Sequence, residues 1–404
     1  MSETSLNEVA VDGRSRGSNQ SGLRAHNERA VLSLIRRHGE LAKADIARRT
    51  GLSAQTASVI MRSLENESLV IRDQPRRGRV GQPSVPMRLN PDGVLSFGLK
   101  IGRRSSELVV MDFVGQIRSN RTIRYTYPRV SDIVAFVERG HKELTAEIAP
   151  VLRDRVIGLG VALPFDIWSW AEEIGAPPAD VAPWRDFDAE AELSAITGLP
   201  VYAANDATAA CAAENVFGGS DCANFVYFFI AAFAGGGLVI NGDLVQGRLG
   251  NAGALGSLPI PRKDGGSGQL IEFASLNRLE TAITESDGDP DLILDTEGDW
   301  SELSGTLDNW LNEASRGLAY AVLSACSVYD FEDAIIDGAM PRPILDRLVR
   351  QTRREYETLN RKGISPVRFR SGNVGVNARS LGAASLPLFA RFLLDQRITS
   401  GEAG

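Results

Sequence analysis

The sequence predicts an α/β protein in which a small, mainly helical module precedes a larger domain with a mixed sheet. Charge is the first of three observations: residues 1–90 hold 15 Lys and Arg against 9 Asp and Glu, whereas the other 314 hold 29 against 42. The whole-chain net charge of −7 hides this basic segment. The second observation is a helix, helix, turn, helix and hairpin pattern over 25–89, and the third is an alternation of apolar strands and helices after Asn90-Pro91.

The N-terminal segment changes its pattern at Ala25. Residues 1–22 are rich in Ser, Asn and Gly, so we expect them to form a disordered tail. From Ala25 onward apolar residues recur with a helical period, and His38-Gly39 ends this first helix. A second helix is predicted over 42–50, followed by Gly51, which suits a left-handed turn between two helices.

A third helix is predicted to begin after Ser53, whose hydroxyl suits an N-cap. One face of this helix carries an apolar stripe of Ala57, Ile60, Met61 and Leu64. The opposite face presents Ala54, Gln55, Ser58, Val59 and Arg62. A strand at 69–71, a basic loop over 73–83 and a returning strand at 85–89 complete a winged helix-turn-helix, which we assign to 23–90.

The polar face of the third helix predicts DNA contact. In a helix-turn-helix the second helix of the motif enters the major groove, and its first turn faces base edges and phosphates. We expect Gln55 to read a base edge, because a side-chain amide pairs with adenine. Ser53 and Thr56 suit phosphate oxygens, and Ser58 and Arg62 are further candidate contacts.

The loop Arg76-Arg77-Gly78-Arg79 is the predicted wing. Taken alone, such a basic run is more often a solvated linker. Because this run follows a helix-turn-helix at hairpin spacing, we expect Arg76, Arg77 and Arg79 to contact the DNA backbone or a narrow minor groove.

The rest of the chain, 91–404, reads as an α/β domain. Strands are predicted at 94–101, 108–113, 156–163, 201–204, 225–230 and 237–240. Helices are predicted near 131–149, 207–216, 306–326 and 342–358. The acidic stretch 285–302 is rich in Gly and Asp, and we expect it to be a solvated loop.

Composition excludes several classes of protein. No apolar run approaches the roughly 18 to 20 residues of a membrane span, and no charged-then-apolar leader opens the chain. The cysteines, Cys211, Cys222 and Cys326, are too few and too scattered for a disulfide framework or a cysteine-rich zinc site. We therefore expect a cytoplasmic protein that holds neither metal nor cofactor.

Five segments of the larger domain resemble the ROK family of repressors and sugar kinases. They are Gly158–Pro164, Trp184-Arg185-Asp186, Ala204–Ala210, Gly235–Gly242 and Gly250–Gly256. The resemblance covers about residues 25 to 390. It implies an actin-like, two-lobed ATPase fold, with a lobe boundary near 200 and a C-terminal helix near 382–396 that returns to the first lobe. It also implies a sugar bound between the lobes in those members that bind one, and we expect the chain to form a homodimer or a dimer of dimers.

Both phosphate loops depart from the pattern of the family's kinases. The first reads Asp-x-Gly-Gly-Thr in kinases and Lys100-Ile101-Gly102-Arg103-Arg104 here, so the carboxylate on the metal side is lost, although the basic residues could still attract an anion. The second reads Gly-Thr-Gly-x-Gly in kinases and Ala231-Ala232-Phe233-Ala234-Gly235 here. Phe233 places a ring where only Gly permits a tight approach to phosphate. We therefore predict that the chain is not a kinase.

The pair Asn205-Asp206 matches the position of the family's catalytic base. A simpler alternative is that Asp206 only caps the helix that starts at Ala207. The zinc site of the family is not matched, because Ser257 stands at its His position and 262–268 contains neither Cys nor His. Packing or hydrogen bonds must hold that loop instead.

The sugar site that the resemblance implies is partly retained. Ala254 replaces one Glu of the family, and Glu272 lies one residue beyond the position of another, which is Ile271 here. The candidate effector-binding residues are Pro164, Asp166, Asn205 and Asp206. Three nearby tryptophans either stack on a sugar ring or, as is more common, pack between elements: Trp168, Trp170 and Trp184.

The sequence thus predicts a transcription regulator, a repressor of carbohydrate-related genes, that binds double-stranded operator DNA and senses a small sugar or sugar derivative. One alternative is a ROK sugar kinase that retains Asp206 as its base. Another is a DNA-binding scaffold without any effector.

Overall fold

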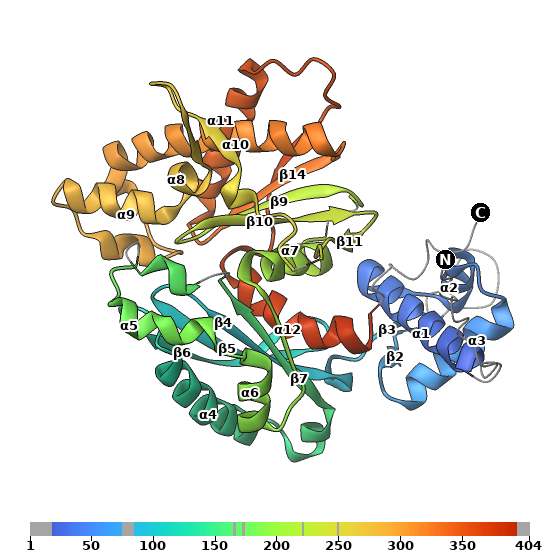
Figure 1. Cartoon of the computed structure of the whole chain (residues 1–404). Coiled ribbons are helices and arrows are strands. Elements are labelled where there is room, and N and C mark those ends of the chain that lie inside the picture. Colours follow the sequence, from blue (N-terminus) through green and yellow to red (C-terminus); the bar gives the residue numbers. More distant parts are fainter. Residues whose placement is uncertain are drawn as a thin grey trace, which may run out of the picture. The chain divides into compact units, whose positions relative to one another are not determined.

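The structure is a computed structural model that describes residues 18–74, 85–164, 167–171, 174–219, 222–248 and 250–393. It forms two compact units (Figure 1). The first contains the described residues up to Arg88 together with Phe392 and Leu393, and the second contains the described residues from Leu89 to Arg391. The predicted wing arginines at 76, 77 and 79 lie outside the described residues, as does Asp166.

The first unit contains three helices, α1 (Ser18–His38), α2 (Lys43–Thr50) and α3 (Ala54–Asn66). The strands β1 (Glu40–Leu41), β2 (Val70–Arg72) and β3 (Met87–Leu89) form a sheet in the order β1-β3-β2. This is the predicted succession of elements. One boundary was wrong: α1 begins at Ser18, inside the segment 1–22 that its polar composition marked as a tail. The helix therefore begins within residues that have little apolar content.

The core of the first unit comes from the predicted stripes. Val31 and Ile35 of α1, Ile46 of α2 and Met61 of α3 are fully buried. Gly51 ends α2 with φ 70°, the left-handed conformation that glycine adopts without strain. The chain can therefore turn tightly between α2 and α3, which fixes the orientation of α3.

The second unit has two lobes, each built on a five-stranded sheet. The first lobe holds β4 (Leu95–Ile101), β5 (Ser105–Asp112), β6 (Ile117–Arg124), β7 (Val156–Leu163) and β8 (Val201–Asn205), in the order β6-β5-β4-β7-β8. Helices α4 (Val130–Glu147), α5 (Pro178–Val181) and α6 (Ala189–Thr197) also belong to it. The strand β6 was not predicted, because this polar strand alternates half-buried and exposed residues.

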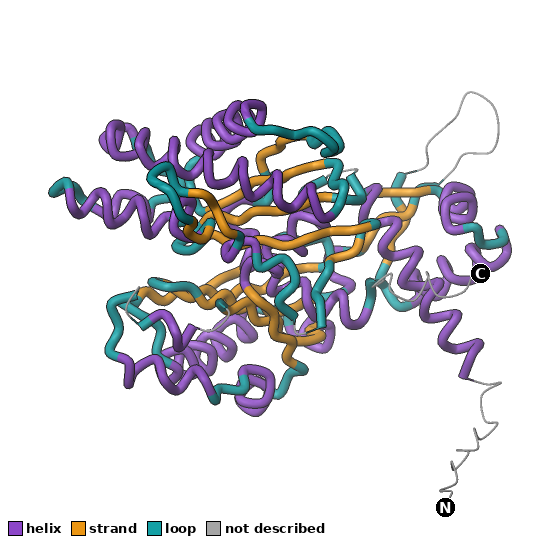
Figure 2. The backbone as a smooth tube through the Cα atoms, turned by 45° about the horizontal axis from the view of Figure 1, so that its top comes forward, coloured by secondary structure: helices purple, strands orange, loops and turns teal. Residues whose placement is uncertain are grey.

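The second lobe repeats this topology. It holds β9 (Phe225–Ile230), β10 (Ala234–Ile240), β11 (Asp243–Leu244), β14 (Asp333–Gly338) and β15 (Arg368–Ser371), in the order β11-β10-β9-β14-β15. Its helices are α8 (Ile271–Ala274), α9 (Leu276–Glu285), α10 (Ser304–Val328) and α11 (Arg342–Thr358). In both sheets the first three strands are antiparallel and the next two are parallel. Figure 2 shows the two sheets as separate layers.

Two helices lie between the two sheets. They are α7 (Asp206–Phe217) and α12 (Ala378–Arg391), which pack on each other, and α12 also packs on β4 and β7 (Figure 1). The helix predicted near 382–396 is α12, which begins and ends about four residues earlier. The predicted lobe boundary near 200 falls short, because β8 continues the first sheet to Asn205 by parallel pairing with β7.

The acidic stretch 285–302 is more ordered than predicted. It contains two short 3-10 turns, Pro290–Leu294 and Ser301–Leu303. Ile293 and Trp300 are buried in the core of the second lobe, and the Trp300 indole N–H donates to the backbone oxygen of Asp295 at 2.9 Å. The buried side chains of Ile293 and Trp300 thus hold in place a segment whose composition is typical of a solvated loop.

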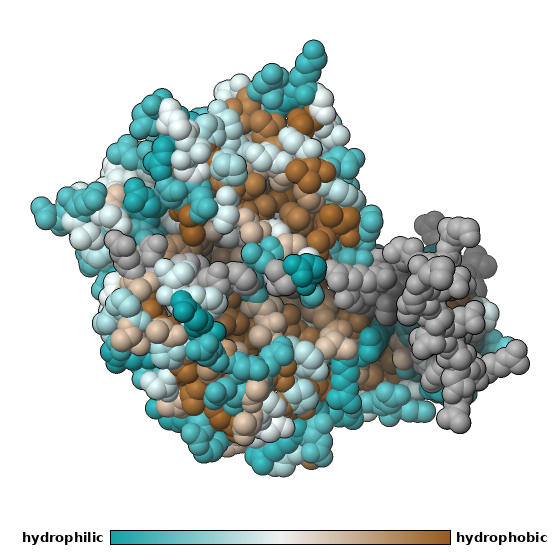
Figure 3. All heavy atoms as spheres, in the orientation of Figure 1, coloured by the Kyte–Doolittle hydropathy of each residue, from teal (hydrophilic) through white to brown (hydrophobic). Residues whose placement is uncertain are grey.

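No helix in the described part of the chain combines the length and the apolar character that a membrane span requires. In the space-filling view, hydrophilic side chains follow the outline of both lobes, and hydrophobic ones are visible within the face of each lobe (Figure 3).

A pair of buried carboxylates holds the loop that leads into α12. Glu214 accepts the N–H groups of Asn373 and Val374, and Asp337 accepts the N–H of Gly375 at 3.0 Å. Burial, and then the negative charge of Asp337, raises the pKa of Glu214 to about 7. Burial likewise raises the pKa of Asp337.

We predict that this pair makes the fold less stable as the pH rises from 5 to 8. The pKa of Glu214 is higher in the folded than in the unfolded chain, so its contribution is complete at low pH and is lost as pH rises through about 7. Glu214→Gln should reduce the fall in unfolding free energy over this range by roughly 2 kcal/mol. Denaturation at several pH values measures the effect, with exposed Glu313→Gln as control; equal pH profiles for the wild type and Glu214→Gln would contradict it.

Candidate functional site

The first candidate site is the exposed face of α3. Ser53 caps the helix as predicted, since its Oγ accepts the N–H of Thr56 at 3.1 Å and lies 2.8 Å from the Thr56 hydroxyl. The cap leaves the first turn of α3 regular and exposed. Gln55 and Arg62 are exposed on this helix, and Ser58 is half-buried between them. The five predicted DNA-contact residues therefore all lie on α3 or at its N-cap.

One further residue of this face carries a signal that the sequence prediction did not use. Val59 is 52% exposed, although valine is usually buried, and it lies between Gln55 and Arg62 on α3. An exposed methyl-bearing side chain on such a helix suits contact with the methyl group of thymine. Val59 therefore joins Gln55 as a candidate for reading bases.

The second candidate site is a cavity of about 340 Å³ between the two lobes of the second unit. Pro164, Asn205 and Asp206, three of the four predicted effector residues, lie in its wall. Trp184 does not belong to the cavity: it is buried, and its indole N–H donates to the backbone oxygen of Pro128 at 3.0 Å. Trp168 is half-buried against the first-lobe core, so both tryptophans pack between elements.

The cap of α7 is Asn205, and this corrects the alternative prediction that Asp206 serves only as a cap. Asn205 Oδ1 accepts the N–H groups of Ala207 and Thr208 at 3.0 and 3.3 Å. Asp206 lies in the first helical turn and pairs through Oδ2 with Arg379 of α12 at 3.3 Å. The Asp206 carboxylate is therefore held by the buried guanidinium of Arg379.

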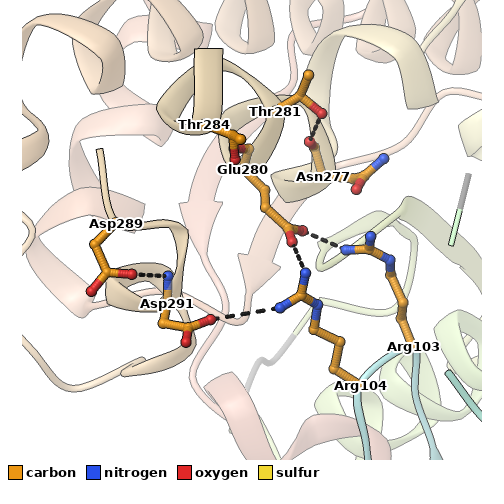
Figure 4. A network of polar contacts seen from close by, with 8 residues as sticks. All are labelled: Arg103, Arg104, Asn277, Glu280, Thr281, Thr284, Asp289 and Asp291. Carbon is orange, nitrogen blue, oxygen red and sulfur yellow. Dashed lines mark hydrogen bonds and ion pairs between the residues drawn. The ribbon is translucent and has the colours of Figure 1, made fainter. Parts of the chain in front are cut away.

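The first phosphate loop is closed by an ion-pair cluster. Arg103 and Arg104 both pair with Glu280 of α9, and Arg104 also lies 3.6 Å from Asp291 (Figure 4). The carboxylate of Glu280 comes from the second lobe, whereas the arginines follow β4 of the first. We call these three residues the Glu280 clamp. Arg103 and Arg104, which could have attracted a free anion, already share the carboxylate of Glu280.

The second phosphate loop is filled by an apolar side chain. Phe233 lies between β9 and β10 and packs against the apolar core of the first lobe. The following glycines belong to the strand β10 rather than to a turn. Phe233 and the Glu280 clamp thus each bring a side chain of one lobe against the other lobe.

Comparisons with known proteins agree with this geometry. The ROK family profile matches residues 96–271, and the profile described as winged helix-turn-helix DNA-binding matches residues 24–71. Residues 96–271 thus match the ROK family, and they follow a segment that matches a winged helix-turn-helix. The xylose repressor of Bacillus subtilis is 24% identical over 246 residues, which cover 60% of this chain and 62% of the repressor.

Two solved structures share the fold of the chain. A ROK family transcriptional regulator, a homologue of the Escherichia coli MLC protein, aligns with a TM-score of 0.66 at 21% identity and covers 92% of this chain and 97% of its own. The ROK glucokinase of Streptomyces griseus, solved with glucose and AMPPNP, aligns with a TM-score of 0.54 at 23% identity. It covers 72% of this chain and 98% of its own. Both likenesses establish the two-lobed fold.

A hairpin and an ion pair hold the segment 259–272, in which the resemblance to the family places a zinc loop. The strands β12 (Pro259–Pro261) and β13 (Ser267–Gln269) pair as an antiparallel hairpin. Backbone hydrogen bonds therefore hold this loop, which is one of the two possibilities that the sequence predicted. Glu272 pairs with Arg262 and accepts the N–H of Gln269, so it points to the hairpin, and Ile271 lines the cavity instead. Among the described residues, no three His, Cys, Asp or Glu side chains are placed to bind a metal ion.

Proposed function

We propose that this chain is a DNA-binding transcription regulator, a repressor of carbohydrate-related genes, whose ROK domain senses an effector in place of catalysing phosphoryl transfer. The observation that carries the proposal is the combination of an exposed, capped α3 with an interlobe cavity whose phosphate loops are closed by Phe233 and the Glu280 clamp. The similarity to the xylose repressor supports a carbohydrate-linked role.

In this mechanism α3 enters the major groove, and Ser53, Gln55, Thr56, Ser58 and Arg62 contact DNA. The protein acts in the cytoplasm as a homodimer or a dimer of dimers, so two winged helices face two half-sites. An effector in the cavity would favour one arrangement of the lobes and thereby change the spacing of the half-site readers. The effector contacts are Pro164, Asp166, Asn205 and Asp206.

A sugar kinase is the second candidate function, because Asp206 lines the cavity next to Asn205. We propose that the chain does not act as one. Phosphoryl transfer needs room and donors for the triphosphate and its metal, and Arg103, Arg104 and Phe233 occupy that place. An ATP-dependent phosphorylation assay over a hexose panel tests this, with Asp206→Asn as control. If the wild type phosphorylates a hexose and Asp206→Asn abolishes this turnover, the proposal that the chain is not a kinase is refuted.

Genome-wide mapping of bound sites tests the function directly. We expect discrete sites upstream of genes for carbohydrate uptake or metabolism, and release of a bound fragment by a sugar or sugar derivative in an anisotropy titration. Binding with no site preference, or the absence of DNA binding by the full chain, would defeat the proposal.

We predict that Gln55→Ala weakens binding to the mapped site by about 1–3 kcal/mol while binding to unrelated DNA stays unchanged. The amide of Gln55 is exposed in the first turn of α3, so its loss removes a base contact without disturbing the core. Anisotropy titrations with specific and random duplexes at one salt concentration measure both affinities. Asn66→Ala, at the far end of the same helix, is the matched control; equal losses on both duplexes would contradict base reading by Gln55.

A further inference from the structure

One surface of the second lobe carries a charge opposite to that of the rest of the domain. Residues 342–370, which comprise α11 and the chain that follows it into β15, hold nine Lys and Arg against three Asp and Glu. Residues 91–404 as a whole hold 29 against 42. The structure describes all of 342–370. We call the exposed side chains of this segment the α11 surface.

The buried face of α11 determines which of its cations point outward. Leu345 and Leu348 belong to the apolar core of the second lobe, where α11 packs on α10 (Figure 1). Arg350, Arg353 and Arg354 are exposed on the remaining sides of the helix. Because residues three and four positions apart are neighbours on a helix, these arginines form one continuous basic ridge.

The carboxylates of the chain leave part of this ridge unpaired. Arg353 forms an ion pair with Glu357 at 2.9 Å. Arg350 and Arg354 form no ion pair with any residue that the structure describes. Like charges four residues apart repel each other and destabilise a helix. The two arginines therefore impose a cost on the free protein that a bound polyanion would remove.

A groove of about 670 Å³ continues the α11 surface beyond the end of the helix. Four cations lie in its wall: Arg353, Arg361, Lys362 and Arg368. The guanidinium carbon of Arg361 lies 5.4 Å from the centre of the Tyr356 ring, and this contact holds the cation in place. Arg368 pairs with the buried Asp333, whereas Lys362 has no ion-pair partner among the described residues. The row of cations thus extends from α11 into the following loop.

The make-up of the α11 surface favours nucleic acid over protein as its partner. Protein interfaces centre on large apolar or aromatic anchors, whereas interfaces with DNA are more polar and more positively charged. None of the large, exposed apolar side chains of the described chain lies within 342–370. Eight of the nine cations are arginines, and a guanidinium can pair with two phosphate oxygens at once.

We propose that the α11 surface binds the phosphate backbone of duplex DNA, and that Arg350, Arg354 and Lys362 make these contacts. Phosphate contacts do not depend on base sequence, so the α11 surface adds affinity for every duplex and leaves the choice of site to α3. This inference goes beyond the proposed function, which places the DNA contacts of the chain on the helix-turn-helix alone.

Anisotropy titrations of the full chain at several salt concentrations test the proposal. Each cation that neutralises a phosphate steepens the plot of log K against log salt concentration by about 0.9. The double variant Arg350→Gln, Arg354→Gln should therefore lower the slope by about two and weaken binding at least about tenfold near ~0.1 M salt. The loss should be equal for the mapped site and for a random duplex. Lys362→Gln should lower the slope by about one.

If neither the double variant nor Lys362→Gln differs from the wild type in slope or affinity, DNA contact by the α11 surface is refuted. An acidic protein would then be the remaining class of partner. Because Arg350 and Arg354 are exposed and unpaired, the Tm of the double variant should equal or exceed that of the wild type. A loss of DNA affinity at an unchanged Tm therefore reports a lost contact rather than unfolding.

Arg139→Gln combined with Lys142→Gln is the matched control. Both cations are exposed on α4 of the first lobe, and their replacement changes the net charge as much as the double variant of α11 does. The control should keep the slope of the wild type. If it lowers the slope as far as the α11 variant does, net charge accounts for the effect and the assignment to α11 is wrong.

The same titrations keep the two proposals apart. If the chain has mapped sites and the α11 variants bind them as the wild type does, the α11 surface fails and the regulator stands. If the chain prefers no site but binds random DNA through Arg350 and Arg354, the regulator fails and the α11 surface stands. The absence of DNA binding by the full chain would defeat both.

Discussion

Gly160→Ala is expected to lower the unfolding free energy of the ROK domain by more than about 3 kcal/mol and to reduce the yield of folded protein. Gly160 lies in β7, and a Cβ added there would meet the backbone oxygen of Ala383 at 1.7 Å. The obstacle is the backbone of α12, which no change of rotamer can move aside.

The position of α12 is fixed from other sides, which is why it cannot retreat. A Cβ at Gly98 of β4 would meet the backbone nitrogen of Ala384 at 2.6 Å, so this strand also lies against α12. On the opposite side, a Cβ at Gly382 would meet the backbone oxygen of Ala209 in α7 at 1.9 Å. Relief of the clash at Gly160 therefore displaces two packed helices that separate the lobes.

Differential scanning calorimetry of the full chain measures the effect, and we expect a Tm fall of roughly 6 °C or more. Gly305→Ala is the matched control. A Cβ at Gly305 of α10 meets no atom within 4 Å, so this change should be neutral or stabilising by about 0.5–1 kcal/mol. Similar melting temperatures for the two variants would contradict the close packing of α12.

Local patterns predicted those parts of the fold that depend on near neighbours in sequence. The cap at Ser53, the turn at Gly51 and the buried stripe of α3 each involve residues within one or two helical turns. The strands β7 and β9 were also predicted at their observed bounds, since they are continuous apolar runs. The polar edge strand β6 offered no such run, and nothing local distinguishes it from a loop.

The chemistry of the interlobe site depended on contacts that the sequence pattern does not reveal. Arg103 and Glu280 are 177 positions apart, and Asp206 and Arg379 are 173 apart. The replacement of Gly and Thr by arginine could be recognised from the loop itself. The carboxylate that pairs with these arginines belongs to Glu280, which lies on α9 of the other lobe, and α9 was not predicted. Only the fold brings these residues together.

Glu280→Gln is expected to lower the unfolding free energy by about 3 kcal/mol, because it breaks the Glu280 clamp. The side chains of Glu280 and Arg103 are each 13% exposed, and that of Arg104 is 38% exposed. The amide keeps the shape of the carboxylate but leaves two guanidinium groups without their shared anion. Removal of one partner from a buried pair usually costs 3–5 kcal/mol, and the partial exposure of Arg104 places the expectation at the lower end.

A double-mutant cycle separates the ion pair from a general effect of mutating α9. Arg103→Met removes the buried cation, so combining it with Glu280→Gln should cost clearly less than the sum of the two single changes. Glu285→Gln, an exposed change on the same helix, should alter stability by less than about 0.5 kcal/mol. If the single changes add, or if Glu280→Gln behaves as Glu285→Gln does, the clamp does not hold the lobes together. A strong coupling would instead mean that the lobes are joined at the first phosphate loop by the protein's own carboxylate.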